Sequence, residues 1–220
     1  GWYADNGSAG RASCHGLNYS PGVCAVYEAI QHAVCRGAMV IAAAGNHPGG
    51  VEMSRGPTVP AAWETLPMPT FDECRELENG NDATYVQFVD RMQRSGFRIF
   101  PMPMIGPGIV QPTTAGYAAL VHAIGGLDGA DQNLINARAF AQPRLAAPGS
   151  FGGGVLDQYT TGVEVWDRIV GTQSLTGSSM SAAVASGVAA TLWSYNPRLS
   201  APELAELLYR SSVPTRSKAN

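Results

Sequence analysis

The chain has 220 residues, of which 45% are hydrophobic and 14% charged, enough apolar content for one globular domain with a sizeable core. Its formal net charge of −3 and pI near 5.8 give no electrostatic reason to expect nucleic acid or an acidic membrane as a partner. No segment has the apolar length needed to cross a bilayer, and the first residues lack the parts of a signal peptide.

The first predicted element is an amphipathic helix over 23–36. Its apolar residues recur at steps of three and four and define a core stripe of Val23, Val26, Tyr27, Ile30, Ala33 and Val34. Cys24 and Cys35 lie off this stripe, and helical rise places them roughly 16 Å apart, too far to bond with each other. Cys24 can reach Cys14, whereas Cys35 and Cys74 can each pair or stay free. The cysteine and histidine spacings match no paired zinc-ligand pattern, so no metal site is assigned.

An apolar strand is predicted over 37–46, which reads Gly-Ala-Met-Val-Ile-Ala-Ala-Ala-Gly-Asn. Continuous apolar runs are typical of buried parallel strands. Asn46 then lies at a strand's carboxyl end, the edge where open α/β sheets bind ligands. Its side-chain amide can donate a hydrogen bond to an oxyanion there. The plainer alternative is that Gly-Asn forms only a turn.

The stretch that follows contains further predicted elements. Helical spacing predicts a helix over 82–94, and 97–100 is read as a strand. Glu76, Glu78 and Asp82 lack the spacing of a calcium loop, which favours solvated surface. Another strand is predicted over 118–124, with a turn over 125–131. His122 is interpreted as a packed or exposed strand histidine, because a lone histidine without a visible partner is rarely catalytic.

The most informative stretch surrounds Ser179, where 176–182 reads Thr-Gly-Ser-Ser-Met-Ser-Ala. A glycine lets the backbone turn tightly, and the serine then lies at a helix N-terminus, where the helix dipole favours negative charge beside its oxygen. The small residues that follow let such a helix pass close beneath a sheet. The alternative is a capping serine on a buried alanine-rich helix.

The last predicted element is a helix that begins with a capping box at Ser200 and Glu203, with Pro202 in its first turn. Leu204, Leu207, Leu208 and Ser211 are predicted to form its core stripe. The polar tail over 211–220 is expected to fray.

Three markers in this order resemble those of the subtilisin-like serine peptidases: the strand ending in Ala-Gly-Asn at Asn46, Leu-Ala-Ala-Pro-Gly at 145–149, and the Gly-Ser-Ser-Met-Ser run around Ser179. In the third of these markers the family has Gly-Thr-Ser-Met-Ala. Ser178 of this chain therefore takes the place of the threonine, and Ser181 that of the alanine. The resemblance implies an α/β fold, a three-layer sandwich around a mostly parallel sheet, incomplete at the N-terminus.

For domain organisation, the resemblance implies that 1–220 is the C-terminal portion of a peptidase domain. It carries an inserted segment at about 60–117, where the family has a short connection. We hypothesise that this segment rims the substrate cleft or holds a partner.

For the site, the resemblance implies that Ser179 is the nucleophile and that Asn46 and the Ser179 N–H form the oxyanion hole. Ala43, Ala44 and Gly45 would line one wall of the pocket for the residue before the scissile bond. The implied partner is a peptide or protein substrate, at a secreted or extracellular location. No cofactor is indicated by the residues themselves, although many members of the family use calcium.

The chain departs from the family in two places. The nucleophile motif continues with Ala183-Val184 in place of a Pro-His pair. In the family, the aspartate and histidine of the triad lie well before the oxyanion asparagine. Here only 45 residues precede Asn46, and neither Asp5 nor His15 lies in a family motif.

We therefore expect an upstream segment or a companion chain to supply the aspartate and histidine, and this chain alone to be inactive. Two alternatives remain. The chain is a catalytically incomplete pseudoprotease or peptide-binding module, or it is an esterase or other hydrolase on a different fold. The last is disfavoured because the Gly-x-Ser-x-Gly elbow is absent around Ser179.

Overall fold

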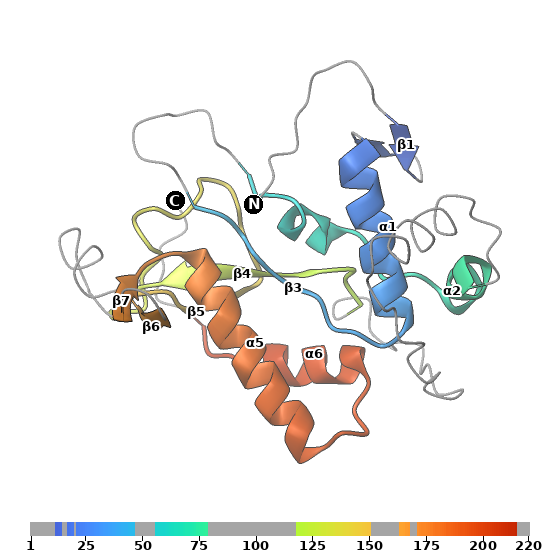
Figure 1. Ribbon diagram of the computed structural model, residues 1–220. Coiled ribbons are helices and arrows are strands. Elements are labelled where there is room, and N and C mark those ends of the chain that lie inside the picture. The colour runs from blue at the N-terminus through green and yellow to red at the C-terminus, as the bar shows by residue number, and fades with distance from the viewer. Residues whose placement is uncertain are drawn as a thin grey trace.

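The computed structural model describes residues 12–14, 17–19, 21–46, 56–78, 118–150, 163–167 and 171–214. Its elements, drawn in Figure 1, are β1 (Ala12–Cys14), β2 (Leu17–Tyr19), α1 (Pro21–Cys35), β3 (Ile41–Ala43), the 3-10 helix η1 (Ala61–Thr65), α2 (Phe71–Glu78), β4 (His122–Leu127), β5 (Leu145–Pro148), β6 (Val163–Asp167), β7 (Gly171–Leu175), α5 (Ser178–Tyr195) and α6 (Ala201–Ser211). Among the described residues, no helix is long and apolar enough to cross a membrane.

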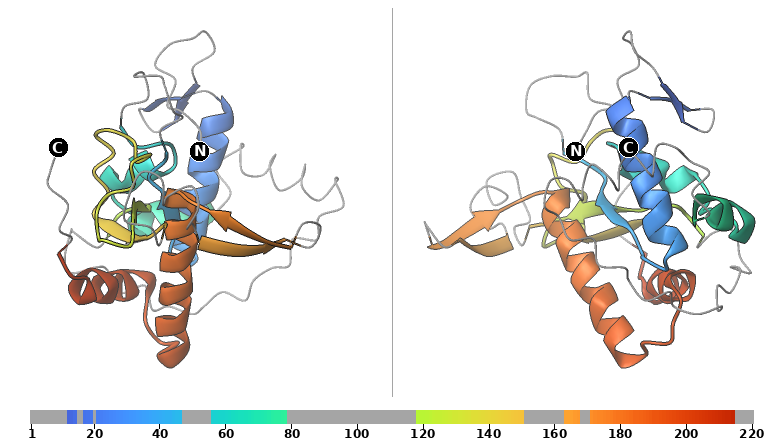
Figure 2. Two further views of the ribbon diagram at one scale, coloured as in Figure 1. Left: turned by 90° about the vertical axis from the view of Figure 1, so that its left-hand side faces the viewer. Right: turned by 45° about the vertical axis from the view of Figure 1, so that its right-hand side comes forward.

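A three-stranded parallel sheet in the order β3–β4–β5 organises the fold. Ile41 pairs with His122 and Ala43 with Ile124, while Leu127 pairs with Pro148. The β6–β7 pair is an antiparallel hairpin that projects beside this sheet, as both views of Figure 2 show. The parallel sheet with helices confirms the predicted α/β class.

One predicted strand position was wrong. The strand predicted over 118–124 begins at His122 and continues to Leu127, because Gly125 and Gly126 pair with β5 rather than turning. The Leu-Ala-Ala-Pro-Gly marker at 145–149 contains β5, which runs from Leu145 to Pro148.

Helices cover both faces of the sheet. Successive residues of a strand point to opposite faces. Ala123 belongs to the core cluster that includes Tyr27 of α1 and Trp63 of η1. Gly126, three residues further along β4, lies against Ser181 of α5 on the other face. The three layers are therefore α1 with η1, the sheet, and α5, as predicted.

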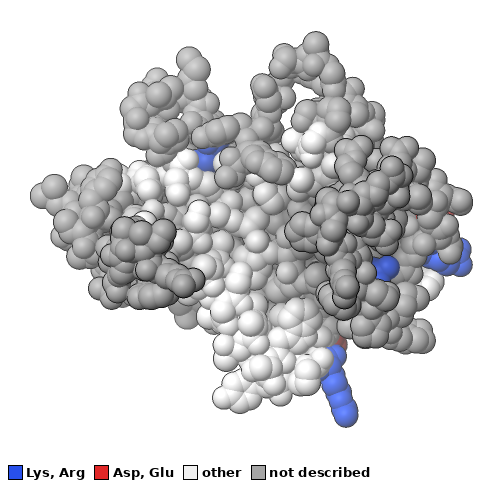
Figure 3. All heavy atoms as spheres, in the orientation of Figure 1, with Lys and Arg blue, Asp and Glu red and all other residues white. Residues whose placement is uncertain are grey.

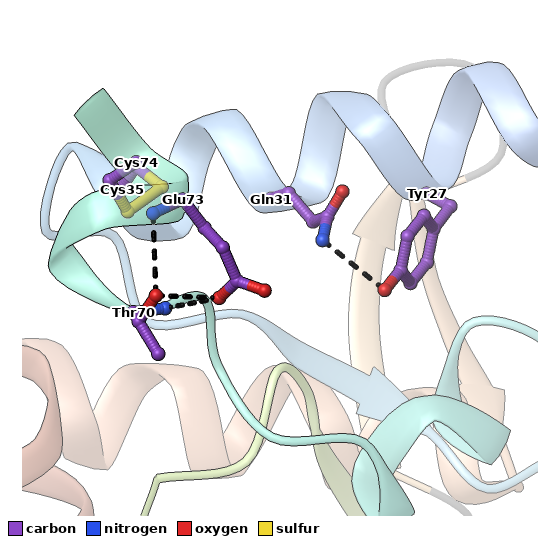
Figure 4. Close-up of a disulfide and its surroundings, with 6 residues drawn as sticks. All are labelled: Tyr27, Gln31, Cys35, Thr70, Glu73 and Cys74. Atoms are coloured by element: carbon purple, nitrogen blue, oxygen red, sulfur yellow. Dashed lines mark hydrogen bonds between the residues drawn. A yellow bond between two sulfur atoms is a disulfide. The ribbon is translucent and has the colours of Figure 1, made fainter. Parts of the chain in front are cut away.

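The core stripe of α1 includes residues that sequence periodicity left out. Tyr27 and Val34 are buried as predicted, but Cys24 and Cys35 are buried too. Cys24 packs in the core cluster with Tyr27 and Val34 and is disulfide-bonded, whereas Cys35 bonds Cys74 and packs against α2. Figure 4 shows the Cys35–Cys74 bond joining the two helices.

The start of the predicted insertion and the residues that follow it lie side by side, just before β4. The Met68 N–H donates to the Ala118 carbonyl at 2.7 Å, and the Leu120 N–H donates to the Leu66 carbonyl at 2.9 Å. The helix α2 follows, and its first turn is capped by Thr70 and Glu73 (Figure 4). The helix and strand predicted at 82–94 and 97–100 lie outside the described residues.

This placement separates α2 from the sheet edge that holds Asn46. Cys35 ends α1 and leads into the start of β3, whereas Asn46 follows the end of β3. Figure 1 shows α2 on the far side of the sheet from β6 and β7. The hypothesis that the insertion rims the cleft therefore depends on residues beyond α2, outside the described part.

The helix α6 begins as its sequence predicts, with Ser200 and Glu203 forming a capping box. Its predicted core stripe is correct only in part. Leu204 is fully buried, but the other buried residues are Ala201 and Ala205, and Leu207 is 44% exposed.

Candidate active site

The carboxyl end of β3 and the N-terminus of α5 meet through Asn46 and Ser178, which lie 132 positions apart in the chain. The Ser178 N–H and its hydroxyl both donate to Asn46 Oδ1, at 2.9 and 3.0 Å. The Ser178 hydroxyl oxygen in turn accepts from the Gly45 N–H at 3.1 Å. With Oδ1 occupied by two donors, the Asn46 Nδ2 group is left as the donating end of the amide.

Gly177 allows this close approach. Its φ of +150° is one that residues with side chains rarely adopt, and a Cβ there would lie 2.5 Å from Asn46 Nδ2. The glycine before the serines is therefore required both by the turn into α5 and by the position of the asparagine.

Ser179 is exposed at the start of α5, next to the buried Ser178. The first N–H groups of a helix have no intrahelical acceptor. Asn46 accepts from the Ser178 N–H, and the Gly177 carbonyl accepts from those of Met180 and Ser181. Among the described residues nothing accepts from the Ser179 N–H, so this donor and the positive end of the α5 dipole face outward together.

The three residues predicted to form a pocket wall, Ala43, Ala44 and Gly45, directly precede Asn46 in the chain. Ala44 is buried, while Ala43 and Gly45 are half-buried. A Cβ on Gly45 would meet Arg138 Cδ at 2.6 Å and Thr58 Cγ2 at 2.7 Å, so residues far along the chain pack against this wall. Asn46 itself pairs with Ala137 in an antiparallel bridge.

His122 lies at the amino end of β4 and faces α6, in keeping with its interpretation as a packed strand histidine. Its Nδ1 lies 3.3 Å from the Tyr209 hydroxyl, which donates to Glu64 Oε1 at 3.1 Å. Burial, with a smaller effect from the Arg144 charge, lowers the pKa of His122 to about 4. Burial also raises the pKa of Glu64, against the effect of the hydrogen bonds it accepts.

Asp5 and His15 lie outside the described residues. Within the described residues, no three His, Cys, Asp or Glu side chains are grouped so that they could hold a metal ion.

Sequence reasoning did not identify the side chains that contact Gly45 and Asn46, namely those of Ser178 and Arg138. Ser178 was noted only as a substitution in the nucleophile motif, and Arg138 was not singled out. The position of Ser178 between Gly177 and Ser179 was the one available signal, because the first N–H groups of a helix need an acceptor from outside it.

A comparison with protein families matches residues 5–220 to the family described as the subtilase family, which covers nearly the whole chain. No curated protein matches the chain in a sequence comparison.

Proposed function

The chain belongs to the subtilase family and is thus a serine-type peptidase, a hydrolase; on that premise, we propose that Ser179 is its nucleophile and Asn46 its oxyanion-hole donor. One observation supports this assignment above all. Two hydrogen bonds from Ser178 hold Asn46 Oδ1, which leaves Nδ2 to donate beside the exposed start of α5. An asparagine that only formed a turn would not need this connection.

The reaction we propose is acyl transfer. Ser179 Oγ attacks the carbonyl carbon of a peptide bond while a histidine takes the hydroxyl proton. The carbonyl oxygen becomes an oxyanion between Asn46 Nδ2 and the Ser179 N–H. The C–N bond then breaks, the leaving amine takes the proton from the histidine, and water hydrolyses the acyl-enzyme. Ala43, Ala44 and Gly45 line the pocket for the side chain before the scissile bond of a peptide or protein substrate.

We propose that an upstream segment or a companion chain supplies the histidine and aspartate. In support, α5 carries no charged residue and is mostly apolar, a composition typical of a buried helix. Yet one of its faces is exposed, at Ser179, Ala183, Ser186, Gly187, Ala190 and Ser194. Figure 3 shows this surface without acidic or basic atoms. In addition, β3 is an edge strand of the described parallel sheet, so its unpaired backbone groups offer a place for a further strand to pair.

The test compares peptide hydrolysis by the complete peptidase, carrying the histidine-bearing part, with that of two variants. Ser179→Ala is expected to abolish turnover. Asn46→Ala is expected to lower kcat by about 10²–10³-fold with little change in KM, a magnitude taken from subtilisin itself. Unchanged kcat in either variant contradicts the proposal.

The alternative is a pseudoprotease or peptide-binding module that keeps the pocket but has an incomplete triad. It predicts that the complete protein binds peptides without cleaving them, and that Ser179→Ala binds them equally well. Efficient cleavage by this chain alone would contradict our expectation that it is inactive without the histidine, because an unactivated serine hydroxyl is a weak nucleophile.

We also propose an extracellular location. The Cys35–Cys74 disulfide supports it, since disulfides persist in oxidising compartments. Calcium dependence stays a proposal carried by family resemblance alone. It predicts that a chelator lowers the melting temperature of the complete protein.

A further inference from the structure

Arg138 lies buried behind the predicted pocket wall, 7% exposed. Its Nε donates to the Gly56 carbonyl at 2.7 Å, a strong hydrogen bond from a charged donor. Its Cδ fills the space where a side chain of Gly45 would begin. The aliphatic part of the Arg138 side chain thus packs on Gly45, and its guanidinium holds the backbone of Gly56.

The backbone around Arg138 contacts the same two places. Ala137, just before it, pairs with Asn46, and Ala139, just after it, accepts a hydrogen bond from the Gly56 N–H at 2.8 Å. Asn46 and Gly56 flank residues 47–55, so the segment centred on Arg138 holds the chain on both sides of that stretch.

The contact between Arg138 and Gly45 is connected to the N-terminus of α5 through Ser178. Gly45, on which Arg138 packs, donates its N–H to Ser178 Oγ, and Ser178 holds Asn46 Oδ1. A shift of the Gly45 backbone would lengthen the first of these bonds and turn the asparagine amide. Small displacements of groups that stabilise the transition state are costly, about 10²-fold in rate for about 1 Å.

We propose that Arg138 is a positioning residue for the peptidase reaction, which fixes Gly45 and thereby aims Asn46 Nδ2 at the oxyanion. This inference rests on the proposed role of Asn46. Arg138 acts through Asn46 and need not touch the substrate.

The first test needs no activity. Arg138→Met keeps much of the side-chain length but removes the hydrogen bond to Gly56, and the exposed Arg210→Met is its control. In this chain, amide hydrogen exchange at Gly45 and Ser178 is expected to speed up by about tenfold or more in Arg138→Met, while Ala123, bonded to Glu64, is unchanged. Equal acceleration at all three amides, or none, overturns the proposal.

The second test uses the complete peptidase. Arg138→Met is expected to lower kcat by about tenfold or more with KM within about threefold, and to cause no further loss when Asn46 is already alanine. An equal loss in both backgrounds shows that Arg138 does not act through Asn46 and overturns the inference. If Asn46→Ala itself leaves kcat unchanged, the proposed function fails. If Asn46→Ala lowers kcat and Arg138→Met does not, only the role of Arg138 fails.

Discussion

At the scale of single residues, the site depends on Ser178, the neighbour of the proposed nucleophile. Ser178 is buried and holds Asn46, while Ser179 beside it is exposed. The motifs around Asn46 and Ser179 could be predicted because each is local. The bond between Asn46 and Ser178 could not, since it joins positions 132 apart and arises only when the chain folds. Arg138 was missed for the same reason.

Gly177, the N-cap of α5, and Gly187, within the helix, make a matched comparison. Gly177→Ala is expected to lower the free energy of unfolding by about 1–3 kcal/mol, because its φ of +150° is strained for alanine and the new Cβ meets Asn46. Gly187→Ala, with nothing within 4 Å of the new Cβ, is expected to raise that free energy by about 0.5–1 kcal/mol. Urea denaturation measures both. A Gly177→Ala protein as stable as the parent would contradict the site geometry.

His122 makes stability depend on pH. In the unfolded chain it binds a proton near pH 6.5, but in the folded chain its pKa is lowered to about 4, beside Tyr209, Glu64 and Arg144. Between these values the unfolded state binds more protons, so the free energy of unfolding falls as pH drops, by up to about 3 kcal/mol. The raised pKa of Glu64 acts in the opposite direction, because the folded state then keeps a proton longer.

The contribution of His122 is isolated by His122→Gln, which keeps a polar group for Tyr209. The free energy of unfolding is measured between pH 4 and 6.5 in both proteins. The variant is expected to lose less stability over this range than the parent. Identical pH profiles would show that His122 is not buried as described.

At the scale of elements, helices could be predicted better than strands. α1 and α6 begin within about two residues of their predicted starts, because periodicity and capping residues are local signals. The strand predicted over 118–124 begins later, at His122, because Ala119 pairs with Pro67. The residues before His122 therefore pair with the start of the insertion and not with the parallel sheet. The core stripe predicted for α1 missed two cysteines, because Cys24 packs in the core cluster and Cys35 is buried against α2.

The capping box of α6 gives a test at this scale. Glu203 Oε2 accepts from the Ser200 N–H at 2.8 Å, and the Ser200 hydroxyl oxygen accepts from the Glu203 N–H. Ser200→Ala is expected to lower the free energy of unfolding by about 1 kcal/mol. The control, Ser194→Ala on the exposed face of α5, is expected to change it by less than about 0.5 kcal/mol. Equal effects of the two substitutions would mean that the box does not stabilise α6.

At the scale of the whole molecule, the α/β class and its three layers were implied by the family resemblance that the three ordered motifs carry. The path of the insertion could not be predicted, because it depends on a disulfide between α1 and α2 and on pairing at Leu66–Met68. Its described part lies away from Ser179. The exposed face of α5, which carries no charge, supports the proposal that a further part of the peptidase packs there.

The central claim is that Ser179 is a nucleophile activated only when the histidine is present. Its most direct test is to treat this chain and the complete protein with a fluorophosphonate and to locate the adduct by mass spectrometry. We predict one adduct, on Ser179, that forms rapidly in the complete protein and far more slowly in this chain. An adduct on another serine, or equally fast labelling of both proteins, would contradict the account.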